Sequence, residues 1–192
     1  MIKIERKTKE TDIKVELKLY GEGQSDIDTG VGFFDHMLES FSKHALIDLT
    51  VRCKGDTHID DHHSVEDVGI VLGQAILKAL GNKESMKRYG TFFVPMDEAL
   101  VMVSLDISAR SYLYYNLDLP AFSIGNFDIE MVEEFFRAIA QNAGLTLHII
   151  LLHGKNTHHI IEAAFKAFGR ALNIASTLDE RYTGVPSTKG LL

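Results

Sequence analysis

Two adjacent histidines followed three residues later by a glutamate occur twice in this chain. The pattern reads His62-His63-Ser64-Val65-Glu66 in the first half and His158-His159-Ile160-Ile161-Glu162 in the second. The copies are 96 residues apart in a chain of 192 residues, and Gly73 and Gly169 repeat at the same offset. Neutral imidazole and carboxylate side chains are suitable ligands for Mn, Fe, Co or Zn. The repetition therefore indicates a duplicated half-domain in which each copy supplies metal ligands.

The spacing also limits how these side chains can share an ion. On a helix, residues four apart are separated by roughly 40° and residues three apart by roughly 60°, so Glu66 shares a face with His62 and His63. Adjacent histidines diverge by roughly 100°. We therefore expect each histidine of a pair to serve a different ion, with ligands gathered from both halves or from neighbouring subunits.

Other polar residues near the first histidine pair give weaker signals. Asp60 and Asp61 directly precede it and could cap the helix, or could accept a hydrogen bond from the ring nitrogen of a ligand histidine that does not bind the metal. Capping is the favoured interpretation. The spacing of His44, His148 and His153 matches no such pattern, so each alone is interpreted as structural.

Composition bounds the class of protein. With 45% hydrophobic and 24% charged residues the chain is typical of a soluble globular protein, and a net charge of -7 argues against a general nucleic-acid or membrane surface. The single Cys53 cannot form an internal disulfide and is expected to pack in a reducing compartment. No apolar run approaches the roughly 18 residues of a membrane span, and the charged first twenty residues do not resemble a signal peptide. We expect a cytoplasmic protein.

Hydrophobic periodicity predicts that each half contains strand, strand, helix, strand and helix. In the first half these elements are expected at 2–9, 12–20, 32–42, 46–53 and 61–80. In the second half they are expected at 100–108, 111–117, 128–142, 145–152 and 157–177. The join near 88–91 divides the chain into residues 1–90 and 91–192. This order favours an α+β fold in which helices cover one face of each of two mixed sheets.

Six longer motifs follow one another in a specific order. They are RKTKET (6–11), GFFDHML (32–38), GDTHIDDHH (55–63), PMDEAL (95–100), GKNTHHIIEA (154–163) and PSTKG (186–190). In these motifs the chain closely resembles the imidazoleglycerol-phosphate dehydratase family of histidine biosynthesis, and the resemblance runs almost end to end.

The resemblance implies two manganese ions per active site. The implied ligands are His36, His62, His63, Glu66, His158, His159 and Glu162. The family usually has a histidine at an eighth position, within the segment VEHFF, whereas this chain reads VEEFF at 132–136 and so has Glu134 there. Because a carboxylate is a competent manganese ligand, Glu134 is a candidate for the eighth ligand.

The resemblance also implies a hydro-lyase that converts imidazole glycerol phosphate to imidazole-acetol phosphate through a metal-bound imidazolate. Glu10 is the implied acid–base residue. The implied substrate-binding residues are Glu10, His44, Arg88, Arg110, Lys166, Ser187, Thr188 and Lys189, with the cations and Ser187 suited to a phosphate. The family forms homo-oligomers of 24 subunits built from trimers, so the same is expected here.

Two alternatives remain open from the residues alone. A dinuclear metallohydrolase of a small phosphorylated substrate would also use paired ions, which activate water for hydrolysis. A metal buffer or structural assembly without catalysis would need the histidines but not the phosphate-binding residues.

Overall fold

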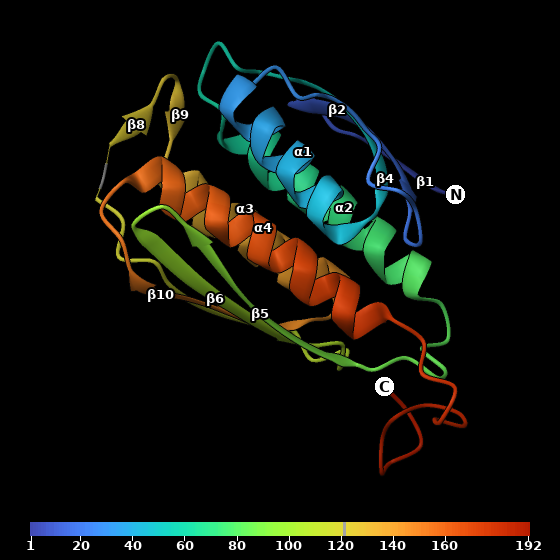
Figure 1. Cartoon of the computed structure of the whole chain (residues 1–192). Coiled ribbons are helices and arrows are strands. Elements are labelled where there is room, and N and C mark those ends of the chain that lie inside the picture. Colours follow the sequence, from blue (N-terminus) through green and yellow to red (C-terminus); the bar gives the residue numbers. More distant parts are fainter. Residues whose placement is uncertain (121) are drawn as a thin grey trace.

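Two sheets enclose two layers of helices in the computed structural model, which describes residues 1–120 and 122–192 (Figure 1). The first half contains β1 (Ile2–Lys7), β2 (Thr11–Lys18), β3 (Ser25–Asp28), α1 (Gly32–Ala45), β4 (Asp48–Gly55) and α2 (His62–Leu80). The second half contains β5 (Tyr89–Met96), β6 (Ala99–Asp106), β7 (Tyr112–Asn116), β8 (Ser123–Ile124), β9 (Phe127–Asp128), α3 (Glu130–Ala143), β10 (Thr146–His153) and α4 (Thr157–Ser176).

The two large sheets have the same topology. Their strand orders are β1-β2-β4-β3 and β5-β6-β10-β7. In each sheet the last pair is parallel and the other pairs are antiparallel. The predicted α+β class with duplicated halves and mixed sheets is confirmed. Because β5 begins at Tyr89, the expected division after residue 90 falls inside this strand.

The structure adds one strand to each of the two large sheets. β3 has only four residues, of sequence SDID, and three of them are exposed, so it gives almost no hydrophobic signal. β5 lies at the edge of its sheet and contains Gly90 and Pro95, which are weak strand formers tolerated at edges. The short hairpin of β8 and β9 was also not predicted.

Helices cover one face of each sheet and meet in the middle of the molecule. α1 and α2 pack against the first sheet, while α3 and α4 pack against the second (Figure 1). Across the central plane α1 packs against α4 and α2 against α3. The rings of Phe41 on α1 and Phe168 on α4 stack with their centroids 5.2 Å apart. None of the helices in the described part of the chain has the length and apolarity that crossing a membrane requires.

The repeated glycines explain how closely these helices approach. A Cβ at Gly169 on α4 would lie 2.8 Å from the carbonyl oxygen of Phe41 on α1. A Cβ at Gly73 on α2 would lie 2.8 Å from the Cβ of Asn142 on α3. Both distances are shorter than van der Waals contact allows, so only glycine fits without displacing the neighbouring helix. The duplicated sequence thus preserves two equivalent helix crossings.

Candidate active site

Three of the predicted metal ligands meet between α1 and α4. Glu162 Oε2 lies 3.6 Å from Nε2 of His36 and 3.1 Å from Nε2 of His158. One donor atom from each residue lies within 4.8 Å of the other two. Two imidazoles and one carboxylate at this spacing can bind one divalent transition metal ion. We call these three residues the α1–α4 cluster.

The carboxylate of this cluster is buried but ionised. Glu162 is only 7% exposed, and burial raises its pKa. Lys166, whose Nζ lies 2.7 Å from Glu162 Oε1, together with His36 and His158, offsets this cost and leaves the pKa of Glu162 below its usual value. Lys166 is therefore in contact with a predicted metal ligand.

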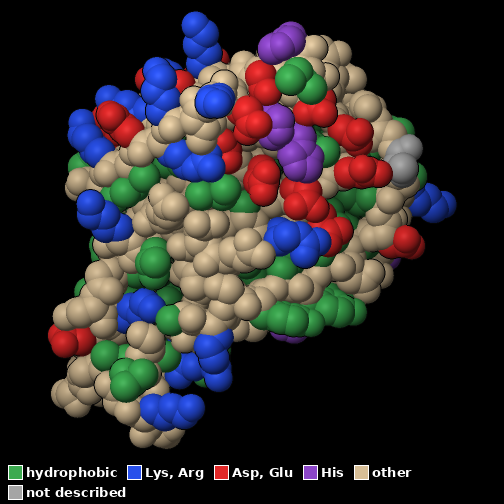
Figure 2. Space-filling view, turned by 180° about the vertical axis from the view of Figure 1, so that it is seen from behind, with side chains coloured by type: hydrophobic (Ala, Val, Ile, Leu, Met, Phe, Trp, Pro, Cys, Tyr) green, Lys and Arg blue, Asp and Glu red, His purple; other side chains and the backbone are tan. Residues whose placement is uncertain are grey.

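The first histidine pair and the predicted acid–base residue lie together on another part of the surface. His62 Nε2 is 3.7 Å from Glu66 Oε2 one turn later on α2. His63 Nε2 is 3.9 Å from Oε1 of Glu10, which lies in the turn between β1 and β2. On the face seen in Figure 2, histidine side chains are surrounded by Asp and Glu side chains. Such a surface attracts cations rather than phosphates.

Glu134 occupies the position in α3 that His36 occupies in α1. Each is the fifth residue of a 14-residue helix, and α3 packs against α2, which contains His62 and Glu66. Arg137 Nε lies 3.6 Å from Glu134 Oε2. In the chain as far as it is described, no second group of three donors is as close together as the α1–α4 cluster. His62, Glu66 and Glu134 are thus on neighbouring helices without forming a closed site in one copy.

The predicted divergence of adjacent histidines is observed. Nε2 of His62 lies 3.7 Å from Glu66, whereas Nε2 of His63 lies 3.9 Å from Glu10. In the second pair, Nε2 of His158 lies 3.1 Å from Glu162, whereas Nε2 of His159 lies 3.8 Å from Asp97. Only His158 of the second pair belongs to the α1–α4 cluster. Each pair therefore presents its two imidazoles in different directions.

The carboxylates that hold the second histidine of each pair were not predicted. Nδ1 of His63 lies 3.0 Å from Asp56 Oδ2, and Nδ1 of His159 lies 2.8 Å from Glu98 Oε2. These contacts raise the pKa of both histidines. The pKa of Glu98 is lowered to about 2 by the hydrogen bond with His159, followed by those from the Asn156 and Lys155 backbones. Both acids lie in motifs that carry the family resemblance, although no role was inferred for them.

The two aspartates considered for capping differ in their contacts. Asp60 Oδ1 accepts a hydrogen bond of 2.9 Å from the backbone N–H of His62, so Asp60 caps the start of α2. Asp61, at the N-cap position itself, makes no capping hydrogen bond with any residue that the structure describes. Neither is the acid that holds Nδ1 of His63.

Five predicted substrate-binding residues line one cavity of about 440 Å³. They are Arg88, Arg110, Ser187, Thr188 and Lys189. Asp106 on β6, which was not predicted, orients the arginines: Arg88 donates two hydrogen bonds of 2.7 and 3.0 Å to its carboxylate, and Arg110 Nη2 lies 3.6 Å from it. Arg88 Nη1 also donates to the Pro186 carbonyl at 2.9 Å and so holds the C-terminal segment. We call this pocket the cation cavity.

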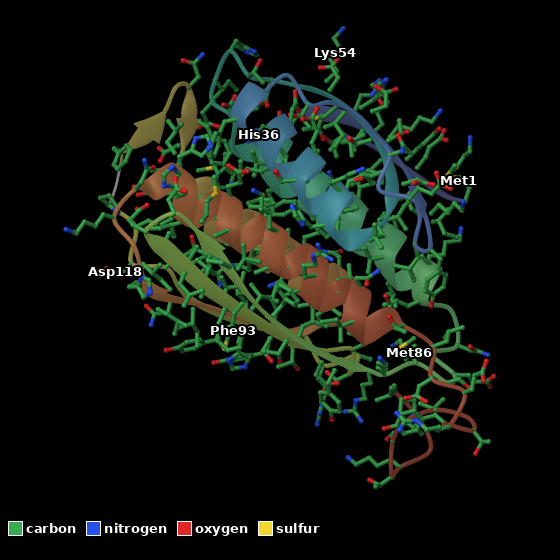
Figure 3. All side chains as sticks on the ribbon, in the orientation of Figure 1. Met1, His36, Lys54, Met86, Phe93 and Asp118 are labelled. Carbon is green, nitrogen blue, oxygen red and sulfur yellow. The ribbon has the colours of Figure 1, made fainter. Side chains whose placement is uncertain are left out.

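The cation cavity and the α1–α4 cluster lie at opposite ends of α4. The Arg88 backbone N–H donates to the Ala175 carbonyl, whereas His158 is the second residue of the helix. These 17 residues correspond to about 25 Å of helix. Figure 3 shows the same separation, with His36 at one end of the helix layers and Met86 at the other. Glu10, His44 and Lys166 are not among the residues that line the cavity.

His44 lies near the C-terminal end of α1. Its pKa is lowered by burial, and then by the nearby charges of Arg170 and Lys166. A neutral imidazole is therefore favoured at this position, beside two cations of α4.

Comparison with known proteins identifies the class and family. Residues 29–172 match the model of a family described as imidazoleglycerol-phosphate dehydratase. The chain is 66% identical over 189 residues to the imidazoleglycerol-phosphate dehydratase of Caldanaerobacter subterraneus, which covers 98% of this chain and 97% of that protein.

Solved structures agree with this match. The crystal structure of imidazoleglycerol-phosphate dehydratase from Staphylococcus aureus aligns with a TM-score of 0.82 and 46% identity, over 93% of this chain and 100% of that one. The enzyme from Pyrococcus furiosus aligns with a TM-score of 0.85 and 38% identity, over 98% of this chain and 100% of that one. Because a dehydratase is a lyase that removes water, this chain is an enzyme of the hydro-lyase class. Within that class it belongs to the imidazoleglycerol-phosphate dehydratase family.

Proposed function

We propose that this chain dehydrates imidazole glycerol phosphate to imidazole-acetol phosphate in histidine biosynthesis, using two manganese ions per active site. The observation that carries the proposal is the α1–α4 cluster, where donor atoms of two imidazoles and an ionised carboxylate lie within 4.8 Å of one another. This donor set suits a divalent transition metal, and the family membership supplies the substrate.

Different residues of the chain would bind the metal ions, transfer the proton and bind the phosphate. His36, His158 and Glu162 would hold one ion; His62, His63, Glu66, Glu134 and His159 are the remaining proposed ligands. When bound, manganese would supply positive charge beside the ring nitrogens of the substrate's imidazole, which favours loss of a ring proton. Glu10, next to His63, would take a proton from the carbon beside the one that loses its hydroxyl. The cation cavity would bind the phosphate.

One copy of the chain cannot bring both ends of the substrate to these residues. The imidazole and phosphate are joined by only three carbons, whereas the cluster and the cavity are about 25 Å apart along α4. We therefore propose that each active site combines residues of neighbouring copies, in a homo-oligomer of 24 subunits built from trimers.

The outer face of the second sheet supports assembly. Tyr89 and Phe93 on β5, Tyr112 and Tyr114 on β7, and Leu152 on β10 are between 42% and 58% exposed. Figure 3 shows Phe93 on the side of β5 away from α4. A face with this many exposed large apolar side chains is typical of a protein interface.

The products of the reaction test this function. Metal-loaded protein incubated with imidazole glycerol phosphate is expected to form a ketone that still carries its phosphate, because elimination of water leaves the phosphate ester intact. Mass spectrometry would detect the loss of one water, and a phosphate assay would detect hydrolysis. Release of inorganic phosphate without ketone would instead support the metallohydrolase.

Substitutions should separate phosphate binding from proton transfer. Arg110→Ala and Lys189→Ala each delete a charge-assisted contact worth about 1.5 to 3 kcal/mol, so KM should rise roughly 10- to 150-fold. Arg88→Ala should raise KM as well and also loosen the segment held at Pro186. Glu10→Gln should lower kcat with little change in KM, because the amide cannot transfer the proton.

Steady-state kinetics with a Lys3→Ala control would check this division. Lys3 is exposed on the outer face of β1 and pairs with Glu16, so its removal should change neither constant. If all four variants lowered kcat and raised KM alike, the division of roles would be refuted.

A further inference from the structure

In each histidine pair, a carboxylate from another segment contacts Nδ1 of the second imidazole, on the ring edge away from Nε2. Asp56, just after β4, places its oxygens 3.0 and 3.2 Å from Nδ1 of His63. Glu98, in the turn between β5 and β6, places Oε2 2.8 Å from Nδ1 of His159. The two acids are not at equivalent positions of the repeat, so each half forms its carboxylate–histidine contact with a residue from a different loop.

We propose that Asp56 and Glu98 are positioning residues that fix the tautomer and orientation of His63 and His159 for metal binding. An ionised carboxylate can only accept a hydrogen bond, so Nδ1–H of each histidine donates to it and Nε2 keeps a free lone pair. Those Nε2 atoms face away from Asp56 and Glu98, toward Glu10 and Asp97 at 3.9 and 3.8 Å. The proposal rests on the proposed metal binding and adds residues that never touch the ion.

The surroundings of the two acids differ in a way that a substitution can reveal. Oε1 of Glu98 accepts hydrogen bonds from the backbone N–H groups of Lys155 and Asn156 at 3.1 and 2.6 Å, while Oε2 accepts from His159. Both side-chain oxygens of Asp56 lie near the same nitrogen of His63. The Glu98 carboxylate is therefore held on one side by the backbone before α4 and on the other by His159. The Asp56 carboxylate can direct either oxygen toward His63.

Glutamine at position 98 would be forced into one orientation. Its amide oxygen must face the two backbone N–H groups, so its NH₂ group faces Nδ1 of His159. Nδ1 must then accept, which places the ring proton on Nε2 and blocks the proposed ligand atom. Asparagine at position 56 has no such constraint and can turn its oxygen toward His63. Alanine at position 98 leaves Nδ1 to water and imposes no tautomer.

Glutamine at position 98 should therefore lower manganese affinity more than alanine does, although both substitutions remove the same negative charge. Free Mn²⁺ would be measured by electron paramagnetic resonance during titration of the metal-free full-length variants. Glu98→Gln is expected to weaken binding 10- to 100-fold at one of the two ions. Glu98→Ala should weaken it less than Glu98→Gln, and Asp56→Asn should stay within threefold of wild type while Asp56→Ala weakens it about tenfold.

A helix-cap variant controls for simple loss of structure. Asn156 Oδ1 accepts from the backbone N–H groups of His158 and His159, so Asn156→Ala loosens the start of α4 without touching the bond between Glu98 and His159. It should bind manganese within threefold of wild type, with circular dichroism reporting the fold of every variant.

Three results would overturn the inference while leaving the proposed function intact. They are wild-type affinity in Glu98→Gln, equal losses in Glu98→Gln and Asn156→Ala, and a greater loss in Glu98→Ala than in Glu98→Gln. The last two would mean that Glu98 affects metal binding only by holding the backbone at the start of α4, and not by fixing the tautomer of His159. A wild-type protein that binds no manganese would overturn the proposed function and this inference together.

Discussion

His158→Ala is expected to empty the α1–α4 cluster of manganese and to lower turnover by more than about 100-fold. His158 Nε2 lies 3.1 Å from Glu162, and without it only one imidazole and one carboxylate remain at this point. The fold should survive, because the side chain of His158 is 41% exposed and its removal leaves no buried cavity. Metal content by mass spectrometry and initial rates would be measured on the same preparation.

Glu39→Gln is the matched control for this substitution. Glu39 lies on α1 one turn after His36 and is exposed, so it changes a charge near the cluster without removing a proposed ligand. It should keep wild-type metal content. Full manganese occupancy in His158→Ala would exclude His158 as a ligand, whatever its activity.

Local geometry made part of the site predictable from sequence. The rotation of about 100° per residue follows from the helix alone, and it predicted that the two histidines of a pair face different groups, as His62 faces Glu66 and His63 faces Glu10. Apolar and charged residues also alternate in the strand expected at 12–20, and its apolar residues Ile13, Val15 and Leu17 are buried in β2. β3 was missed because four largely exposed residues contain no period to detect.

Contacts between residues that are far apart in the sequence could not be predicted from local helix and strand geometry. Glu98 and His159 are 61 residues apart, and a turn and a helix start must meet for their side chains to touch. The choice of His158 as partner of His36 depends on the close crossing of α1 and α4, which Gly169 permits. The cation cavity was anticipated only through the family resemblance, since Arg88 and Pro186 are 98 residues apart.

Removal of manganese with a chelator is expected to dissociate the assembled protein into smaller, inactive species. His62, Glu66 and Glu134 do not form a closed site within one copy as described, and the cation cavity lies far from the α1–α4 cluster. An ion that bridges copies stabilises only the assembled state, so the oligomer depends on metal concentration by mass action. Restoring manganese should recover both size and activity.

Titration of the metal-free protein with manganese, followed by light scattering and by turnover, tests most directly whether metal ions build the active site. Particle size and dehydration rate are expected to rise together and to level off near two manganese ions per subunit. A full-size particle with empty metal sites would show that assembly does not need the ions. Full turnover in the metal-free protein would contradict the account itself.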